Sequence, residues 1–171
     1  MRENVPMKIS HVVMHSGDAD ATSRYYSDLF GFRLRDRTRS MNFLGCNADH
    51  HSLAFVRGGP APLVHHIAFE LPNIDAVMRG AGRLKRNGIP LEWGVGRHGP
   101  GNNVFAYFFD PAGFAVEYTT EMQQIDDATY RVGTPEDWER PANSDQWGVA
   151  SPPSERFLAP RFLRYDSAPT A

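Results

Sequence analysis

The pattern of apolar and polar residues predicts that the chain begins with a strand and continues into a helix. Over residues 8–14 (KISHVVM) the apolar side chains recur with period two. The strand face predicted in this way carries Ile9, His11 and Val13. Over residues 18–30 the period changes to that of a helix, bounded by Asp18 as a typical N-cap and Gly31 as a typical stop. The apolar positions of this helix are Ala21, Tyr25 and Leu29.

The same order of elements then occurs a second time. Three short strands complete the first unit, at 32–36, 40–45 and 51–56. The second unit is predicted as a strand, a helix and three strands at 64–71, 73–86, 89–93, 103–109 and 114–120. Neither unit can bury its sheet face alone. We therefore predict an α+β fold in which paired βαβββ modules, at about 8–57 and 64–120, form a curved mixed sheet around a cavity.

After the second unit the regular apolar periodicity of the sequence ends. Six prolines interrupt residues 121–171, yet this segment keeps aromatic side chains that a disordered tail usually lacks. We expect one domain over residues 1–123 and an irregular arm over residues 124–171. The arm is expected to pack on that domain or on a neighbouring subunit, with its last few residues loose.

Composition narrows the class of protein without identifying it. The chain has 171 residues, 41% hydrophobic and 22% charged, which suits one globular domain. Its net charge of −2 predicts no nucleic-acid or anionic-membrane partner. Cys46 is the only cysteine, so no internal disulfide can form. No apolar run approaches the roughly 20 residues of a membrane span, and we expect a cytoplasmic protein.

Histidine placement points to a metal ion. All seven histidines lie within the first 98 residues, and His11 and His66 occupy equivalent places in the first strands of the two units. Glu117 lies in an otherwise apolar strand, where a buried carboxylate needs a positive neighbour. Two imidazoles and one carboxylate can hold one face of an octahedral ion. The alternative is that each is an ordinary core or surface residue.

A hairpin should bring a phenol beside this carboxylate. Tyr107 and Glu117 flank the turn sequence Asp110-Pro111-Ala112-Gly113. Opposite residues of a hairpin share a sheet face. We therefore expect Tyr107 to lie opposite Glu117, with an odd number of residues between Phe109 and Ala115.

The double βαβββ pattern, with these histidines and Glu117, resembles the vicinal oxygen chelate superfamily, and within it the type I extradiol ring-cleaving dioxygenases. The resemblance covers about residues 8–120. It implies that iron(II), or alternatively manganese(II), is held by His11, His66 and Glu117. His65 would then point to the other face, as packing or as a hydrogen-bond partner.

Three further positions match residues around the metal in that family. The resemblance implies that His51 is an acid/base histidine beside the oxygen site. It also implies that His98 contacts a ring hydroxyl of the substrate and that Tyr107 helps to orient and deprotonate the same catechol. The alternatives are a strand-edge histidine, a surface-loop histidine and a core tyrosine. Trp93, five residues before His98, is either part of the pocket mouth or the end of a core strand.

The resemblance implies aromatic compound degradation, in which both atoms of O2 enter a catechol and the ring opens beside the two hydroxyls. An acidic substituent would need a cation such as Arg131, Arg140 or Arg156. Alternatives are a fosfomycin-type thiol transferase, a glyoxalase-like enzyme or a non-enzymatic bleomycin-resistance-like binding module. Most extradiol enzymes of this type carry two module pairs and this chain has one, so we expect a homodimer or higher homo-oligomer.

Overall fold

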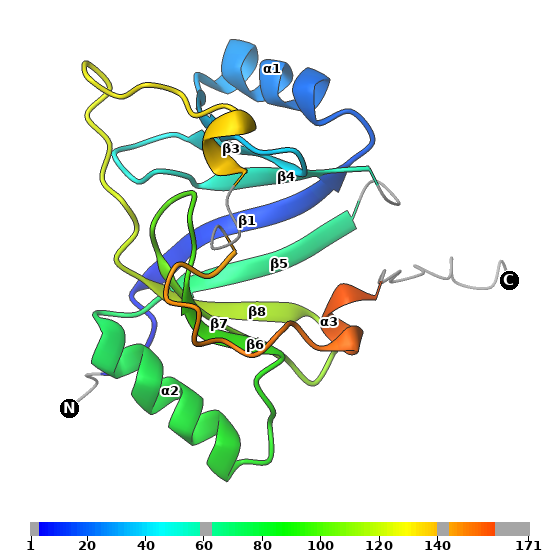
Figure 1. Ribbon diagram of the computed structural model, residues 1–171, viewed down its shortest axis with the longest axis vertical. Helices are drawn as coiled ribbons and strands as arrows, with labels where there is room; N and C mark the ends of the chain where they lie inside the picture. Colours follow the sequence, from blue (N-terminus) through cyan, green and yellow to red (C-terminus); the bar gives the residue numbers. More distant parts are fainter. Residues whose placement is uncertain (1–3, 59–62, 140–143, 160–171) are drawn as a thin grey trace, which may run out of the picture.

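The computed structural model describes residues 4–58, 63–139 and 144–159 (Figure 1). The elements of the first module are β1 (Lys8–Ser16), α1 (Ala19–Phe30), β2 (Arg33–Arg37), β3 (Met41–Gly45) and β4 (Leu53–Arg57). Those of the second are β5 (Leu63–Glu70), α2 (Ile74–Arg86), β6 (Trp93–Arg97), β7 (Val104–Phe109) and β8 (Ala115–Thr120). A 3-10 turn, η1 (Glu136–Trp138), and a short helix, α3 (Glu155–Leu158), follow.

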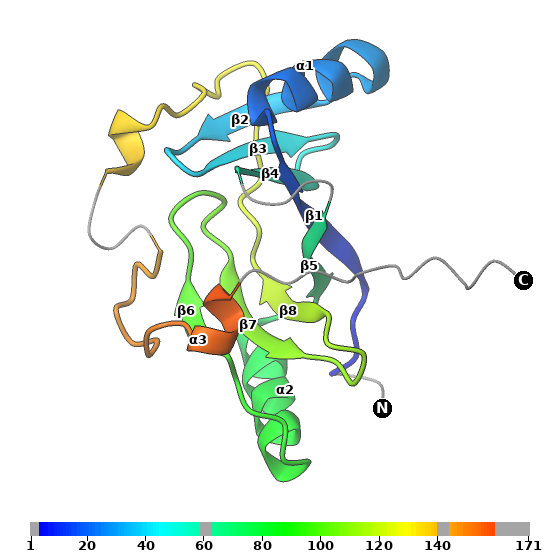
Figure 2. The same ribbon diagram turned by 90° about the vertical axis from the view of Figure 1, so that its right-hand side faces the viewer.

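All eight strands form one mixed sheet in the order β2-β3-β4-β1-β5-β8-β7-β6. Each module contains one parallel pair, β1 with β4 and β5 with β8, and the two modules join where β1 pairs antiparallel with β5. The helices α1 and α2 lie at opposite ends of the molecule (Figures 1 and 2). The predicted α+β fold of paired βαβββ modules is confirmed.

Strand β7 shows how the sheet is covered on both sides. Val104 and Ala106 pack in an apolar cluster under α2, together with Val77 of that helix. The alternate residues Phe105 and Tyr107 face the other side of the sheet, in a cluster that the distant Phe157 closes. Every residue of β7 is therefore buried, because a helix covers one face and a later segment covers the other.

Helix α1 has its predicted ends but presents a different face to the sheet. Asp18 caps it by accepting the Ala21 N–H at 2.8 Å, and Gly31 ends it with φ of 73°. Tyr25 and Leu29, expected toward the core, are 57% and 60% exposed. The small side chains of Ala19 and Ser23 face the sheet instead, where buried Asn42 on β3 hydrogen-bonds to both residues. Small residues let the helix backbone approach the strand closely.

Two strand predictions are corrected by backbone irregularities. The pairing of β1 with β5 shifts between Ile9 and His11, so Ser10 is an extra, bulged residue and Ile9 is exposed rather than on the His11 face. Strand β6 was predicted at residues 89–93 but runs from Trp93 to Arg97. A Cβ at Gly96 would lie 2.6 Å from the Phe105 ring, so the close pairing with β7 requires glycine there.

The segment after β8 runs along one side of the molecule and contacts both modules (Figure 2). Isolated bridges join Gln124 to Asp49 and Gly133 to Asp36 in the first module. Phe157 packs on the second module. The loose C-terminal end that the sequence predicted lies outside the described residues. Among the helices of the described residues, none is both long and apolar enough to cross a membrane.

Asp145 anchors this segment to β6. One carboxylate oxygen accepts the backbone N–H groups of Arg97 and Trp147 at 3.0 and 3.1 Å, and the other accepts those of Val149 and Ala150 at 2.9 Å each. Burial would raise the pKa of Asp145, but these four donors outweigh it and hold the pKa below its ordinary value.

Replacing Asp145 with asparagine should therefore destabilise the fold. The amide NH₂ would face two N–H donors in place of a charged acceptor, and we expect a loss of about 2 kcal/mol in the free energy of unfolding. Urea denaturation measures the change. Asp75→Asn, at an exposed helix pair with Arg79, is the matched control. Equal urea midpoints for Asp145→Asn and Asp75→Asn would contradict the anchoring role of Asp145.

Candidate metal centre

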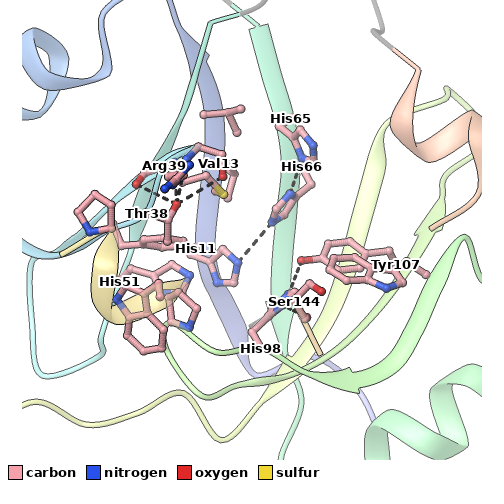
Figure 3. A pocket seen from close by; sticks show the side chains of 18 of the residues that line it. His11, Val13, Thr38, Arg39, His51, His65, His66, His98, Tyr107 and Ser144 are labelled. Carbon is pink, nitrogen blue, oxygen red and sulfur yellow. Dashed lines mark hydrogen bonds between the residues drawn. The ribbon is translucent and has the colours of Figure 1, made fainter. Parts of the chain in front are cut away.

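Three side chains from three central strands converge on one point. His11 on β1, His66 on β5 and Glu117 on β8 are all buried, and one potential ligand atom of each lies within 4.8 Å of the others. Glu117 Oε2 is 3.1 Å from His11 Nε2 and 3.1 Å from His66 Nε2. The two Nε2 atoms are 3.5 Å apart, along the dashed line between His11 and His66 in Figure 3. Over the described part of the chain, no fourth histidine, cysteine or carboxylate joins this group.

These distances suit three neighbouring ligands of an octahedral ion. Two donors about 2.1 Å from an ion and at right angles to each other lie about 3 Å apart. Burial raises the pKa of Glu117, but His11 and His66 outweigh it, so the pKa is held well below its ordinary value. Burial lowers the pKa of His66. A carboxylate beside neutral imidazoles is the protonation state in which these groups bind a divalent cation.

The remaining polar atoms of the triad are already occupied. His11 Nδ1 lies 3.2 Å from Ser10 Oγ, and His66 Nδ1 lies 2.7 Å from His65 Nδ1. Asn103 Nδ2 donates to Glu117 Oε1 at 3.1 Å. Such partners fix the tautomer and orientation of metal ligands. The structure thus leaves Nε2, Nε2 and Oε2 as the free ends that meet.

Asn103 offers a direct test of this support. Its amide also donates to Thr119 Oγ1 at 2.8 Å, and the Thr119 hydroxyl donates to the Val104 carbonyl at 2.8 Å, so the amide is held in place. We expect Asn103→Ala to weaken metal affinity by about 10–100-fold, since Glu117 Oε1 loses its donor. Titration of the metal-free protein with manganese(II) measures it. Asn102→Asp, at the neighbouring exposed residue, is the control and should keep the wild-type affinity. Equal metal affinities in Asn103→Ala and Asn102→Asp would contradict the supporting role of Asn103.

His65 does not turn to the other face as expected. The pairing of β5 with β1 shifts between Val64 and His66, so His65 is the extra residue of a bulge. It lines the same pocket as His66, above it in Figure 3, and the two Nδ1 atoms are in hydrogen-bond contact. The predicted hydrogen bond is confirmed, and the predicted direction is wrong because a bulge breaks the alternation.

The predicted hairpin register is confirmed. Tyr107 on β7 pairs directly with Glu117 on β8, and the five residues 110–114 separate the paired ends Phe109 and Ala115. Trp93 on β6 is in turn the partner of Tyr107. Consequently three neighbouring strands present a carboxylate, a phenol and an indole in one row.

His98 and Tyr107 form a polarised pair in the pocket wall. His98 Nδ1 lies 3.1 Å from the Ser144 carbonyl oxygen, which can only accept, so Nδ1 carries the proton. Tyr107 therefore donates its hydroxyl to His98 Nε2, at 2.9 Å. Burial lowers the pKa of His98 to about 4, and burial together with the Glu117 charge raises the pKa of Tyr107 well above its ordinary value. Both groups are neutral near pH 7.

His51 lies in the loop before β4, on the opposite side of His11 from His98 in Figure 3. Its ring centroid is 4.4 Å from that of His11 and 5.1 Å from that of Phe43. Burial lowers the pKa of His51 well below its ordinary value. Across the pocket, Trp93 is stacked on Tyr107 with ring centroids 5.4 Å apart. The structure thus brings all seven predicted site residues to one centre.

Six of these seven residues, all but Glu117, line a pocket of about 690 Å³. Much of its lining comes from the late segment, which supplies Pro135, Trp138, Glu139, Ser144 and Phe157. The sequence offers the aromatic arm at 130–147 as a candidate lid, but no local pattern marks these individual residues or Phe157, because the contacts are made across about a hundred positions.

Of the cations expected to recognise an acidic substrate, the two that the structure describes do not line the pocket. Arg131 is exposed and paired with Asp137, Arg140 lies outside the described residues, and Arg156 lies over the Phe109 ring. Arg39 lines the pocket instead, in an ion pair with Glu139.

Comparison with known proteins places this geometry in context. Residues 8–118 match the family model described as Glyoxalase/Bleomycin resistance protein/Dioxygenase superfamily. "Metapyrocatechase 2" of Cupriavidus necator is 32% identical over 124 residues, covering 71% of this chain and 38% of that protein. "Iron-dependent extradiol dioxygenase" of Rhodococcus jostii (strain RHA1) is 31% identical over 137 residues, covering 71% of this chain and 46% of that protein.

A solved structure is similar over nearly the whole chain. The Mn(II)-bound glyoxalase from Novosphingobium aromaticivorans superposes with a TM-score of 0.82 and 39% identity, covering 94% of this chain and 52% of that one. This chain therefore spans about half the length of the relatives that it matches.

Proposed function

Since this chain belongs to the glyoxalase/bleomycin resistance protein/dioxygenase superfamily, we propose that it is an extradiol dioxygenase acting on a catechol. The observation that carries the proposal is the arrangement of the three donors. His11 and His66 line the pocket while Glu117 is closed off behind them, so the donors cover one side of a common point and the pocket covers the other. That arrangement is the one that non-haem iron(II) oxygenases use.

We propose iron(II) as the ion held by His11, His66 and Glu117, with manganese(II) as the alternative. When bound, such an ion holds a catechol and O2 next to each other and lets electron density pass from the ring to oxygen. In the overall reaction both oxygen atoms enter the product, and the ring C–C bond beside the two hydroxyls breaks.

In the proposed mechanism the His98–Tyr107 pair accepts a proton from the catechol. Tyr107 already donates to His98 Nε2, so its oxygen keeps lone pairs for a substrate hydroxyl. A proton moving from that hydroxyl to the Tyr107 oxygen can be matched by transfer of the tyrosine proton to His98 Nε2. Neutral His98 is the required form, and its low pKa keeps it available above about pH 5.

His51 is proposed as the second proton-handling group. It lies on the other flank of His11, next to Phe43, where neutral imidazole can accept a proton from the substrate and return one to the ring-opened product. The apolar walls exclude water, which strengthens each of these hydrogen bonds. Stacking between Trp93, Tyr107 and a planar substrate orients the ring.

Anaerobic loading with iron(II), followed by a panel of catechols with O2, tests the proposal. The expected result is a yellow ring-opened product with equimolar oxygen uptake. Bound iron without product or uptake for any catechol would overturn it. The panel should include catechols with apolar substituents and catechols with acidic substituents, because Arg39 at the pocket is the cation that would distinguish them.

A glyoxalase-like activity is the second candidate, because the manganese-bound glyoxalase above is 39% identical. Enzymes of that kind resemble this fold but use four protein ligands. The strand expected to supply the fourth ligand ends Leu53-Ala54-Phe55-Val56 here, without a side chain that binds metal. Turnover of a 2-oxoaldehyde–thiol adduct by the manganese(II) form, without catechol cleavage, would favour it.

We also propose a homo-oligomer, because Tyr25, Leu29 and Phe30 leave an apolar face of α1 exposed. Light scattering on the purified chain tests this.

A further inference from the structure

A carboxylate and two imidazoles form a buried chain that ends at His51. Asp36 Oδ2 lies 2.9 Å from His50 Nε2, and His50 Nδ1 lies 3.0 Å from His51 Nδ1. His50 is fully buried and Asp36 is 1% exposed. Neither residue lines the pocket, so neither can touch a substrate.

The order of these contacts determines where the protons lie. A carboxylate only accepts, so His50 donates from Nε2 and is left with a lone pair on Nδ1 when its ring carries one proton. His51 must then donate from its own Nδ1. Its second nitrogen, Nε2, makes none of the hydrogen bonds found among the described residues, and His51 lines the pocket.

We propose that Asp36 and His50 are positioning residues that hold His51 in the tautomer with its proton on Nδ1, so that Nε2 presents a lone pair to the pocket. The inference rests on the proposed function, since it explains how His51 is prepared to accept a proton from the substrate. A carboxylate behind a catalytic imidazole is known to select its tautomer in this way.

The chain is held at both ends. At its far end, Asp36 Oδ1 accepts the Gly133 N–H at 2.7 Å and the Tyr130 hydroxyl at 3.0 Å, so both oxygens of the carboxylate are committed. A Cβ at Gly133 would lie 2.3 Å from that oxygen, so only glycine fits there. At its near end, a Cβ at Gly101 would lie 2.9 Å from His51 Cε1, so the backbone rests against the ring.

Asp36→Asn reverses the direction of the hydrogen bonds from Asp36 through His50 to His51 without changing the shape of the side chain. The amide oxygen has to stay at the Oδ1 position, because Gly133 N–H can only donate there. The amide NH₂ then faces His50 Nε2 and donates to it. His50 must donate from Nδ1 to His51 Nδ1, and His51 is left with its proton on Nε2, facing the pocket.

The test reads the tautomer directly. Nitrogen-15 NMR on the full chain labelled at histidine and loaded with diamagnetic zinc(II) should show His51 protonated on Nδ1 in the wild type and on Nε2 in Asp36→Asn. Tyr130→Phe removes one hydrogen bond to Asp36 but leaves Oδ2 in place, and should keep the wild-type tautomer. In the iron form, we expect kcat of Asp36→Asn to fall by about 100-fold or more while metal content stays unchanged.

Two results would overturn the inference: an Nε2 proton on His51 in the wild type, as a doubly protonated His50 would produce, or the same tautomer in wild type and Asp36→Asn. If Asp36→Asn does not fold, the wild-type spectrum alone decides. The spectrum can be recorded without any turnover. A failure of the tautomer inference is therefore distinguishable from a failure of the dioxygenase proposal.

Discussion

Glu117→Gln is expected to abolish turnover and to weaken metal binding by well over 100-fold. The substitution keeps the shape of the side chain, but the Asn103 amide donates to Oε1 and therefore holds the new amide oxygen at that position. The NH₂ group then points at His11 and His66, where the Oε2 ligand was, and an amide NH₂ cannot bind a cation. Loss of a ligand should exceed the roughly 10–100-fold expected from loss of a supporting partner.

The measurement is metal content after anaerobic loading with iron(II), together with titration by manganese(II). Circular dichroism should show an intact fold, because Glu117→Gln removes a buried charge and leaves no cavity. Glu136→Gln, an exposed residue of the same type, is the matched control and should load one ion per chain. Wild-type affinity in Glu117→Gln would remove this carboxylate from the metal site and with it the dioxygenase proposal.

His51→Phe is expected to lower kcat by about 100- to 10,000-fold while metal content stays at the wild-type level. Phenylalanine fills the space beside Phe43 and His11, but it can neither accept nor return a proton. KM for the catechol should change by only a few-fold, because the donors of the triad and the His98–Tyr107 pair are untouched. The split between kcat and KM separates a proton-handling role from a role in packing.

Steady-state kinetics with oxygen uptake checks this prediction. His51→Ala serves as a second variant, because phenylalanine leaves His50 Nδ1 without a partner whereas alanine leaves room for a water molecule there. His15→Gln is the control, since His15 lies in the wall of a different cavity. Turnover equal to wild type in both His51 variants would take this histidine out of the mechanism.

Local patterns predicted the parts of the molecule that follow a regular period. The helix cap at Asp18 and the facing of Tyr107 and Glu117 rest on spacings of two or 3.6 residues. The equivalence of His11 and His66 rests on the repeated order of elements, and the structure has each of these features. Period-two reasoning is reliable for β8 because its pairing with β7 runs without a shift from Phe109 to Val104.

Irregular backbone accounts for two of the errors. The bulges at Ser10 and His65 each add one residue to a strand, which turns Ile9 outward and brings His65 into the pocket. Contacts across the chain account for the omissions. Gly133 holds Asp36 against His50 from 97 residues further along the chain, and Phe157 contacts the cluster around Tyr107 from the last described helix. No short-range pattern contains that information.

The proposed ligands are divided between the two repeats. Strand β1 of the first repeat supplies His11, whereas β5 and β8 of the second supply His66 and Glu117. A bound cation would thus cross-link the two repeats, and neither repeat could retain it alone. When the free ion concentration is a thousand times the dissociation constant, such an ion adds about 4 kcal/mol to the free energy of unfolding. Chelation should accordingly loosen the seam between β1 and β5 first, so the amides along that seam would become the earliest to exchange with solvent.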